Sequence, residues 1–361
     1  SADDALKFLI DSARVSKHTE TTSLDESIGR VLSEDIHSKI NVPGFDNSAM
    51  DGYTIALDEK NLNSTKQTFS VVDRIAAGST GKELKKGNAA RIFTGAPIPK
   101  GANTVVMQEE CQASEDGSEI TIRRPIDLNE NIRPTGNDIL KNDVILKTGK
   151  KIEPEDISLA ASVGIAELHV YKRLKVGVFF TGDELVEPGN SLTAGKIYNS
   201  NRYALVALLK NAGCEVLNLG NIKDNFNSTC GALEKLSKSC DLIMTTGGVS
   251  VGEEDHVKPA VEKLGSLNLW KIKMKPGKPL AYGQVRNIPF IGLPGNPVSS
   301  FVTYCIFALP YIKKMQGNSH FKNVAIKVKT NFDCKRAKPR REYARVQIDY
   351  SSESPMASLY P

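Results

Sequence analysis

The chain has 361 residues, of which 40% are hydrophobic and 25% are charged, and these proportions are ordinary for a globular protein of two or more domains. Its net charge of +5 is small for this length, and no row of lysine and arginine is interleaved with aromatic residues, which argues against a nucleic-acid partner. The longest apolar stretch, around 301–309, is far shorter than the roughly 20 residues of a membrane span. We therefore expect neither nucleic acid nor a membrane as a partner.

The first half of the chain predicts two helical pieces separated by a β-rich insertion. Apolar residues between Ala2 and Ala13 recur at helical spacing, and residues 24–32 repeat that pattern more weakly. From about 43 to 142, short β-type runs are interrupted by many glycines and prolines, which is typical of a small β domain. Its expected strands are 69–75, 89–93, 104–108 and 120–122, and a helix is expected again at 152–163.

From residue 174 onward, apolar strands alternate with helices. Strands are expected at 175–180, 215–219, 241–246, 267–274 and 289–293, and helices at 199–212, 228–238, 254–264 and 297–315. This alternation predicts a mostly parallel sheet covered by helices on both faces. The remaining segment is β-rich at 324–330 and 343–350 and is short for a domain.

The most informative segment is 241–255, where an apolar strand ends in a glycine-rich run and then meets acidic residues at the start of a helix. Ligands of α/β proteins bind beyond the carboxyl ends of the strands. Glycines at that position allow backbone N–H groups to approach an anion, and a helix N-terminus adds favourable dipole. Carboxylates beside such a site suggest a divalent cation that bridges them to phosphate. The segment therefore predicts a phosphorylated ligand with a metal ion.

Acidic residues follow two other strands as well. Glu184 comes after the strand 175–180, and Asp224 comes after the strand 215–219, while Asp255 follows the glycine-rich run. One acid in such a loop is more typical of a helix N-cap or of a partner for the helix dipole. Three acidic loops that meet at one sheet edge would instead need a cation, because like charges packed together repel.

A row of lysines follows the acidic loops. Strand periodicity places Lys271, Lys273 and Lys275 on one face, and Lys278 follows after a Pro-Gly turn. Such a row also protects the exposed edge of a sheet in many proteins, so the strand by itself leaves a solvated edge and an oxyanion site equally open. The rigid turn and the additional ammonium group favour the oxyanion site. The Gly/Pro turn at 292–297 precedes a helix and allows either a rigid corner or another anion contact.

Other sequence signals are structural or negative. The polar turns 46–53 and 131–138 carry carboxylates beside glycine and by themselves indicate turns. No P-loop, G-x-G-x-x-G or G-x-S-x-G motif is present, and the five histidines form no ligand cluster, which argues against a dehydrogenase or a serine hydrolase. The six cysteines are widely spaced, and residues 1–7 lack a signal-peptide pattern, so we expect free thiols and a cytoplasmic location.

Eight motifs, taken in order, resemble the molybdopterin molybdenumtransferase family, which includes bacterial MoeA and the E domain of gephyrin. They are DNSAMDGY at 46–53, FTGAPIP at 93–99, NIR at 131–133, TGDEL at 181–185, NSNRY at 199–203, TGGVSVG at 246–252, MKPGKP at 274–279 and GLPGNPVS at 292–299. The resemblance covers essentially the whole chain. It implies a reaction in which adenylylated molybdopterin and molybdate, with Mg²⁺, yield the molybdenum cofactor and AMP.

The resemblance also implies an architecture of α/β and β domains. We expect a discontinuous N-terminal helical linker and dimerisation domain at 1–42 and 143–173, an inserted β domain at 43–142, a molybdopterin-binding α/β domain at 174–317 and an incomplete C-terminal β domain at 318–361. It implies a homodimer whose active clefts lie between the α/β domain of one subunit and the β domain of the other, and contact with the adenylyltransferase of the same pathway. The sequence ends short of the usual family length; for a polypeptide that ends there, we expect weaker molybdate capture, with nucleotide handling less affected.

The resemblance assigns three groups of site residues. Catalytic positions would be Asp51, Asp138, Glu184, Asp224, Asp255, Lys271 and Lys275, with Glu184, Asp224 and Asp255 as the Mg²⁺ ligands. Substrate contacts would come from Thr181, Gly182, Asp183, Gly247, Gly248, Ser250, Gly252, Pro294 and Pro297. Molybdate would be bound by Lys275, Lys278 and Arg345.

Two alternative functions belong to other classes. The α/β region also resembles molybdopterin adenylyltransferase, the enzyme one step earlier, but the β insertion and the motif at 46–53 argue against it. A non-enzymatic scaffold like the receptor-clustering E domain of gephyrin is the second alternative, and the retained acids and lysines argue against that role.

Overall fold

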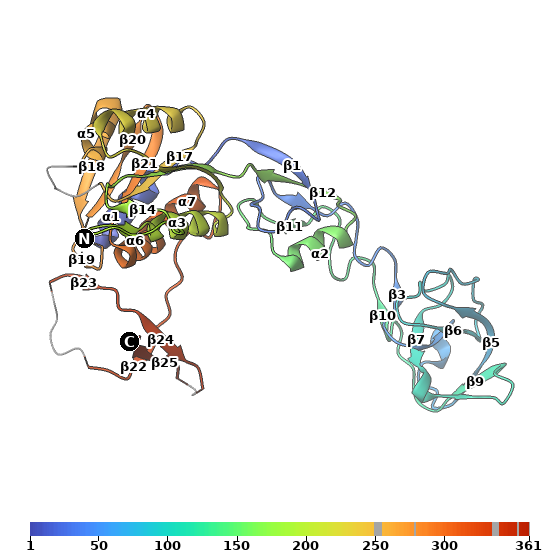
Figure 1. The fold of residues 1–361 in the computed structure, drawn as a ribbon. Coiled ribbons are helices and arrows are strands. Elements are labelled where there is room, and N and C mark those ends of the chain that lie inside the picture. The colour runs from blue at the N-terminus through green and yellow to red at the C-terminus, as the bar shows by residue number, and fades with distance from the viewer. Residues whose placement is uncertain (249–254, 278, 334–338, 352–353, 361) are drawn as a thin grey trace. The chain divides into compact units, whose positions relative to one another are not determined.

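A computed structural model describes residues 1–248, 255–277, 279–333, 339–351 and 354–360 (Figure 1). The chain divides into two compact units. The first comprises residues 1–34, 148–154 and 167–361, and the second comprises residues 35–147 and 155–166. The predicted β insertion, 43–142, therefore lies entirely inside the second unit.

The second unit is built on a six-stranded sheet with the strand order β7-β4-β6-β5-β9-β8 (Figure 1). Its strands are β4 (Gly52–Ile55), β5 (Gln67–Ile75), β6 (Asn88–Ile92), β7 (Thr104–Met107), β8 (Cys111–Ala113) and β9 (Glu119–Ile122). All pairs are antiparallel except β5 with β6. Two clusters of buried apolar side chains stabilise the sheet, one around Phe69 and Ile120 and one around Ile75 and Ile92. The expected strands at 69–75, 89–93, 104–108 and 120–122 are confirmed.

Short strand pairs bring the two polar turns of this unit together. The small elements are β2 (Ile36–His37) with β11 (Val144–Leu146), β3 (Asn47–Ser48) with β10 (Ile132–Arg133), the 3₁₀ turns Glu59–Asn61 and Gln108–Glu110, and helix α2 (Pro154–Ser162). The Asp46 carboxylate accepts hydrogen bonds from the Thr135 backbone N–H at 2.7 Å and its hydroxyl at 2.8 Å. The turns at 46–53 and 131–138 are therefore neighbours in space.

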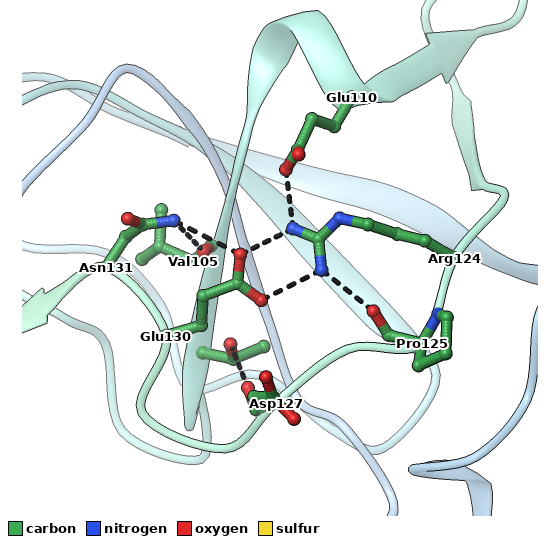
Figure 2. Close-up of polar contacts among 8 residues, drawn as sticks. Val105, Glu110, Arg124, Pro125, Asp127, Glu130 and Asn131 are labelled. Atoms are coloured by element: carbon green, nitrogen blue, oxygen red, sulfur yellow. Dashed lines mark hydrogen bonds and ion pairs between the residues drawn. The ribbon is translucent and has the colours of Figure 1, made fainter.

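Arg124 stabilises the loop that leads into the second of these turns (Figure 2). Its guanidinium forms ion pairs with Glu110 and Glu130, and the hydrogen bonds to these carboxylates, first to Glu130, raise the pKa of the arginine. The Asn131 side chain donates to the backbone carbonyl of Val105 at 3.0 Å. The loop from 124 to 131 is thereby attached to β7.

The first unit contains a second six-stranded sheet with the order β16-β13-β17-β21-β20-β18. Its strands are β13 (Lys175–Phe180), β16 (Glu215–Asn221), β17 (Leu242–Thr246), β18 (Gly265–Lys271), β20 (Pro279–Val285) and β21 (Ile288–Leu293). β16, β13, β17 and β21 are parallel, whereas β20 and β18 continue the sheet in antiparallel fashion. The predicted, mostly parallel sheet is confirmed. Strand β20 is absent from the prediction, because it begins at Pro279, at the end of a Pro-Gly segment whose sequence also suits a turn.

Helices cover both faces of this sheet (Figure 1). α4 (Phe226–Ser237) and α5 (Val257–Leu264) pack against one face. α1 (Ala2–Ser12), α3 (Ser200–Asn211), α6 (Pro297–Thr303) and α7 (Leu309–Met315) pack against the other. A π-helical turn, Tyr304–Ala308, joins α6 to α7, so the predicted helix at 297–315 is continuous. Burial of each large apolar side chain in these clusters contributes about 1.5–3 kcal/mol.

Two N-terminal segments differ from the prediction. Helix α1 begins with a capping box at Ser1, but its buried residues belong to the core of the α/β sheet and not to the expected helical linker domain. Residues 24–32 form turns and isolated bridges in place of a helix, with Val31 opposite Lys151 and Leu32 opposite Val170. Both apolar side chains are buried. The apolar pattern that suggested a weak helix therefore comes from residues buried in these β-bridges.

The remaining strands are short. They are β1 (Thr19–Ser23) with β12 (Glu167–Tyr171), β14 (Leu185–Val186) with β15 (Ile197–Tyr198), β19 (Met274–Lys275) with β23 (Arg341–Glu342), and the three-stranded sheet of β22 (Lys329–Thr330), β25 (Met356–Leu359) and β24 (Val346–Asp349). The expected C-terminal strands are thus present but shorter than predicted, and β25 joins them. No helix within the described residues is long and apolar enough to cross a membrane.

Candidate functional site

The parallel strands of the first unit end at the same level. Phe180 at the end of β13 lies opposite Thr246 at the end of β17, and Thr246 lies opposite Leu293 at the end of β21. The loops that follow these three strands therefore leave the sheet side by side. Because ligands of open α/β sheets bind at this edge, it is the candidate site.

A direct hydrogen bond joins the loops after β13 and β16. The Thr181 hydroxyl donates to the Asp224 carboxylate at 2.6 Å, and Thr181 is buried. The structure thus places one of the predicted acids, Asp224, against the first residue of the TGDEL motif. A hydroxyl bound to one carboxylate oxygen restricts the orientation of the other.

The Glu184 carboxylate folds back onto the same loop. Gly182 has a φ of 145°, and a Cβ atom at this position would lie 2.7 Å from a Glu184 carboxylate oxygen. A side chain at residue 182 would therefore displace Glu184. The Asp183 side chain is exposed, and its backbone carbonyl accepts a hydrogen bond from the Lys196 ammonium at 2.6 Å. The Asp224 carboxylate therefore contacts Thr181, and the Glu184 carboxylate lies beside Gly182, the next residue in the loop.

Glycines line the next part of the edge. The Gly247 N–H donates to the Leu293 carbonyl at 3.0 Å, and a Cβ on Gly295 would lie 3.5 Å from the Gly247 Cα. Gly248 has a φ of 63°, and a Cβ there would lie 2.5 Å from a methyl group of Val257. The positive φ and this close approach both require glycine. Ser250 and Gly252, predicted as substrate contacts, lie outside the described residues.

Helix α3 and the turn before α6 are tied to this edge by asparagines that the sequence analysis did not assign. The Asn201 side chain donates to the Gly295 carbonyl at 2.6 Å, which lies between the predicted contacts Pro294 and Pro297. Asn199 caps α3 and donates to the Asn221 side chain at 2.5 Å. Both asparagines belong to the NSNRY motif. For Asn199, which stands immediately before α3, the available signal was the preference for asparagine as a helix N-cap.

Asp255 lies one residue before His256, the N-cap of α5. Its carboxylate accepts hydrogen bonds from the Val257 and Lys258 N–H groups at 3.1 and 3.4 Å, at the start of α5. Among the residues that the structure describes, no three histidine, cysteine or acidic side chains group closely enough to hold a metal ion. Mg²⁺ in proteins commonly takes one or two carboxylates together with substrate phosphates. Asp224 and Glu184 fit that kind of ligand set.

The predicted lysine row is exposed and is anchored near the candidate site. Ile272 and Met274 are buried while Lys271 and Lys275 are exposed, so the predicted alternation of these four residues is confirmed. The single strand expected at 267–274 is wrong, because β18 ends at Lys271 and β19 comprises only Met274 and Lys275. A Cβ on Gly277 would lie 2.5 Å from the Thr303 hydroxyl of α6. The turn after Lys275 therefore packs on the helix that follows the 294–296 turn. Lys278 lies outside the described residues.

Arg345 lies at a cavity of about 460 Å³ between α3 and α6. Its lining is mostly apolar and includes Leu205, Val298 and Phe301, with Asn201 shared with the sheet edge. The Arg345 guanidinium also lies 5.8 Å from the centre of the Tyr360 ring. The predicted molybdate arginine therefore has an aromatic and aliphatic environment in this structure.

In the second unit, Asp51 is held by a residue that the prediction missed. Its carboxylate accepts hydrogen bonds from the Thr94 backbone N–H at 2.7 Å and from its hydroxyl at 2.8 Å. These two bonds, the backbone bond first, lower the pKa of Asp51. Thr94 lies in the FTGAPIP motif, so the resemblance marked the segment without assigning the residue. Asp138 accepts a hydrogen bond from the Asn137 side chain at 2.8 Å.

We expect Thr94→Val to raise the pKa of Asp51. The substitution keeps the backbone N–H and the shape of the side chain but removes the hydroxyl. That hydroxyl donates to the ionised carboxylate and stabilises it, so its loss should raise the pKa. A lowered folded-state pKa stabilises the fold above the unfolded-state pKa, and this contribution disappears as pH falls through the folded-state value. In the variant, this stabilising contribution of Asp51 should disappear at a higher pH than in the wild type. A carboxylate ¹³C NMR titration measures the change, with Asp46, held in the same way by Thr135, as the internal control. An unchanged Asp51 titration would refute the assignment.

The comparisons with known proteins agree with this geometry. Residues 1–164 match the family model described as the MoeA N-terminal region (domain I and II), and residues 177–314 match the model of a probable molybdopterin binding domain. The chain is 44% identical over 321 residues to a molybdopterin molybdenumtransferase of Haemophilus influenzae, covering 89% of this chain and 78% of that protein. It is 34% identical over 346 residues to one of Bacillus subtilis, covering 94% and 80%.

The structure agrees as well. A crystal structure of the molybdopterin biosynthesis MoeA protein from Pyrococcus horikoshii OT3 superposes with a TM-score of 0.84 at 30% identity, covering 99% of this chain and 89% of that one. The sheet, its glycine turns and the carboxylates at its edge define an α/β ligand-binding protein with an inserted β domain. The chain belongs to the molybdopterin molybdenumtransferase family.

Proposed function

We propose that the chain inserts molybdate into adenylylated molybdopterin and releases AMP, the final step of molybdenum cofactor biosynthesis. The observation that carries the proposal is that the Thr181–Asp224 pair and the glycine turns lie at the same carboxyl edge of the sheet. This edge offers backbone N–H groups for phosphate and carboxylates for a bridging cation. The named relatives from H. influenzae and B. subtilis supply the class of reaction.

The residues divide the work by chemistry. The backbones of Gly247 and Gly248 would receive the phosphate end of the substrate, because glycine allows close approach there. Thr181 would orient Asp224 through its hydroxyl. Asp224 and Glu184 would hold Mg²⁺ against the pyrophosphate, with Asp255 at the adjacent loop. Mg²⁺, when bound, would offset negative charge as the phosphoanhydride is cleaved.

The lysines would bind the second substrate. Molybdate is a tetrahedral dianion, and Lys271 at the end of β18 and Lys275 in β19 offer exposed ammonium groups. The turn that follows Lys275 packs on α6 through Gly277. Lys278 and Arg345 remain the other proposed molybdate ligands. Binding molybdate beside the dithiolene sulfurs would hold both reactants at reacting distance.

A direct assay tests the proposal. The protein is incubated with adenylylated molybdopterin, Mg²⁺ and molybdate, and released AMP and cofactor-dependent activation of an apo-molybdoenzyme are both measured. Release of AMP together with activation supports the function. Consumption of ATP with unmodified molybdopterin would instead identify an adenylyltransferase, and AMP release without any activation would exclude molybdate insertion.

We further propose a homodimer in which Asp51 of the partner subunit completes each site, an interaction with the adenylyltransferase of the pathway, and a cytoplasmic location. The cysteines among the described residues are free thiols, as is usual in a reducing compartment. Burial raises the pKa of Cys240 to about 11, which disfavours its reactive thiolate form.

Mixing two inactive variants should restore activity if the site is shared between subunits. Asp51→Asn and Asp224→Asn change different units of the chain, so a mixed dimer would contain one site with both changes and one intact site. Random exchange should restore about a quarter of wild-type AMP release, because half of the dimers are mixed and each has one good site. The rate after subunit exchange is compared with that of each variant alone. Activity no higher than the sum of the two would contradict a shared site.

A further inference from the structure

A short strand from the C-terminal segment, β23, pairs with β19, the strand that carries Lys275. β23 pairs in parallel with β19, so that Arg341 lies opposite Met274 and Glu342 opposite Lys275. The Arg341 N–H donates to the Lys273 carbonyl at 2.9 Å, and the Tyr343 N–H donates to the Lys275 carbonyl at 2.8 Å. These two backbone bonds set the register of residue 342 against Lys275.

Both neighbours of Glu342 are anchored. The Arg341 guanidinium binds both carboxylate oxygens of Asp3 in α1, at 2.7 and 2.6 Å, a bidentate geometry with well-defined orientation. Tyr343 packs against the apolar core of the α/β unit. Side chains alternate along a strand, so Glu342 is directed away from these contacts and towards Lys275.

Glu342 forms an ion pair with Lys275. The ammonium lies 3.4 Å from a carboxylate oxygen, and the two side chains are 55% and 38% exposed. A pair this accessible to solvent is weak, and another anion can displace it. A tetrahedral dianion at the Lys275 ammonium would meet the Glu342 carboxylate at the same position. The two anions would compete for one cation.

We propose that Glu342 is an internal counterion of the oxyanion site, which competes with the incoming anion for Lys275 and so sets the affinity and the charge selectivity of anion capture. Glu342 is a positioning residue in this role, because it acts on the bound anion through Lys275. The proposal rests on the proposed function only in taking Lys275 as an oxyanion ligand. It requires no catalysis, so anion binding tests it separately from AMP release.

The test is the affinity of Glu342→Gln for two tetrahedral oxyanions of different charge, measured by calorimetry on the whole chain. Removing one negative charge beside the ammonium should tighten molybdate binding by roughly threefold to tenfold, with the exposure of the pair keeping the gain modest. Perrhenate has the same shape but a single charge, so its Coulomb repulsion from the Glu342 carboxylate is half that of molybdate. Removing this repulsion should therefore increase perrhenate affinity by about the square root of the factor for molybdate. In a Lys275→Gln background the gain from Glu342→Gln should shrink.

Two comparisons make the outcome decisive. Glu215→Gln removes an exposed glutamate at the first residue of β16, at the end of the sheet opposite the candidate site, and should leave both affinities within about twofold of wild type, because distant surface charges are screened. Weaker molybdate binding in Glu342→Gln would show that the carboxylate supports the lysine, and this would overturn the proposal. An equal gain for molybdate and perrhenate, or an undiminished gain without Lys275, would overturn it as well.

Discussion

Asp224→Asn is expected to lower the rate of AMP release by about 100-fold or more, since it removes a charge at the point where the reaction must offset developing negative charge. The carboxylate lies at the sheet edge with one oxygen bound to the Thr181 hydroxyl at 2.6 Å. Asparagine keeps the shape and can still accept that bond, so the fold should be retained. Single-turnover AMP release at saturating Mg²⁺ measures the loss, and thermal unfolding checks the fold.

Two companion variants define the origin of this effect. Thr181→Val removes only the hydroxyl that orients Asp224 and should reduce the rate by about tenfold, as expected for a misplaced catalytic group. Asp25→Asn changes an exposed aspartate in the turn after β1 and should leave the rate unaltered. If Asp224→Asn retained more than a tenth of wild-type activity, Asp224 would have no central role in the chemistry.

Lys275→Gln is expected to reduce cofactor formation by about 100-fold at limiting molybdate, because a charge-assisted contact to the dianion is lost. Excess molybdate should recover part of the yield, since the defect lies in binding. Release of AMP should decline less than cofactor formation. The measurement is the activation of an apo-molybdoenzyme as a function of molybdate concentration, with AMP quantified in the same samples.

The matched control for this variant is Lys238→Gln. Lys238 is exposed beyond the end of α4 and carries the same charge, so its replacement tests whether net charge alone affects molybdate uptake. We expect its molybdate dependence to equal that of the wild type. If the molybdate dependence of Lys275→Gln equals that of the wild type, Lys275 does not bind molybdate.

Much of the α/β sheet could be predicted from the sequence. Strand 175–180 agrees residue for residue with β13, and the helix at 297–315 is continuous in the structure. Long apolar runs and helical periodicity are local signals, and burial in the sheet reinforces them. Two segments where the prediction fails also follow local signals, but each of these signals suits more than one structure. Residues 24–32 carry buried apolar side chains in isolated bridges, and β20 begins at Pro279, at the end of a segment that also suits a turn.

The candidate site could be predicted in part. The acids and glycines were found because they follow strands, and the parallel register then places Thr181 and Asp224 together. The metal role of Asp255 stays a prediction, and in the structure its carboxylate accepts hydrogen bonds from the first N–H groups of α5. The sequence alone could not distinguish a metal ligand from an acceptor at a helix N-terminus, because an acid before a helix suits both roles.

By itself, the sequence determined most strands and helices of the α/β sheet, the family and the residue types at the sheet edge, because each of these depends on local pattern or on ordered motifs. Only the tertiary structure decided which distant groups are partners: Thr94 with Asp51, Asn201 with the Gly295 carbonyl, and Glu342 with Lys275. These pairs are separated by 43, 94 and 67 residues. No local propensity relates residues so far apart, and strand register and helix packing bring them within hydrogen-bonding or ion-pairing distance.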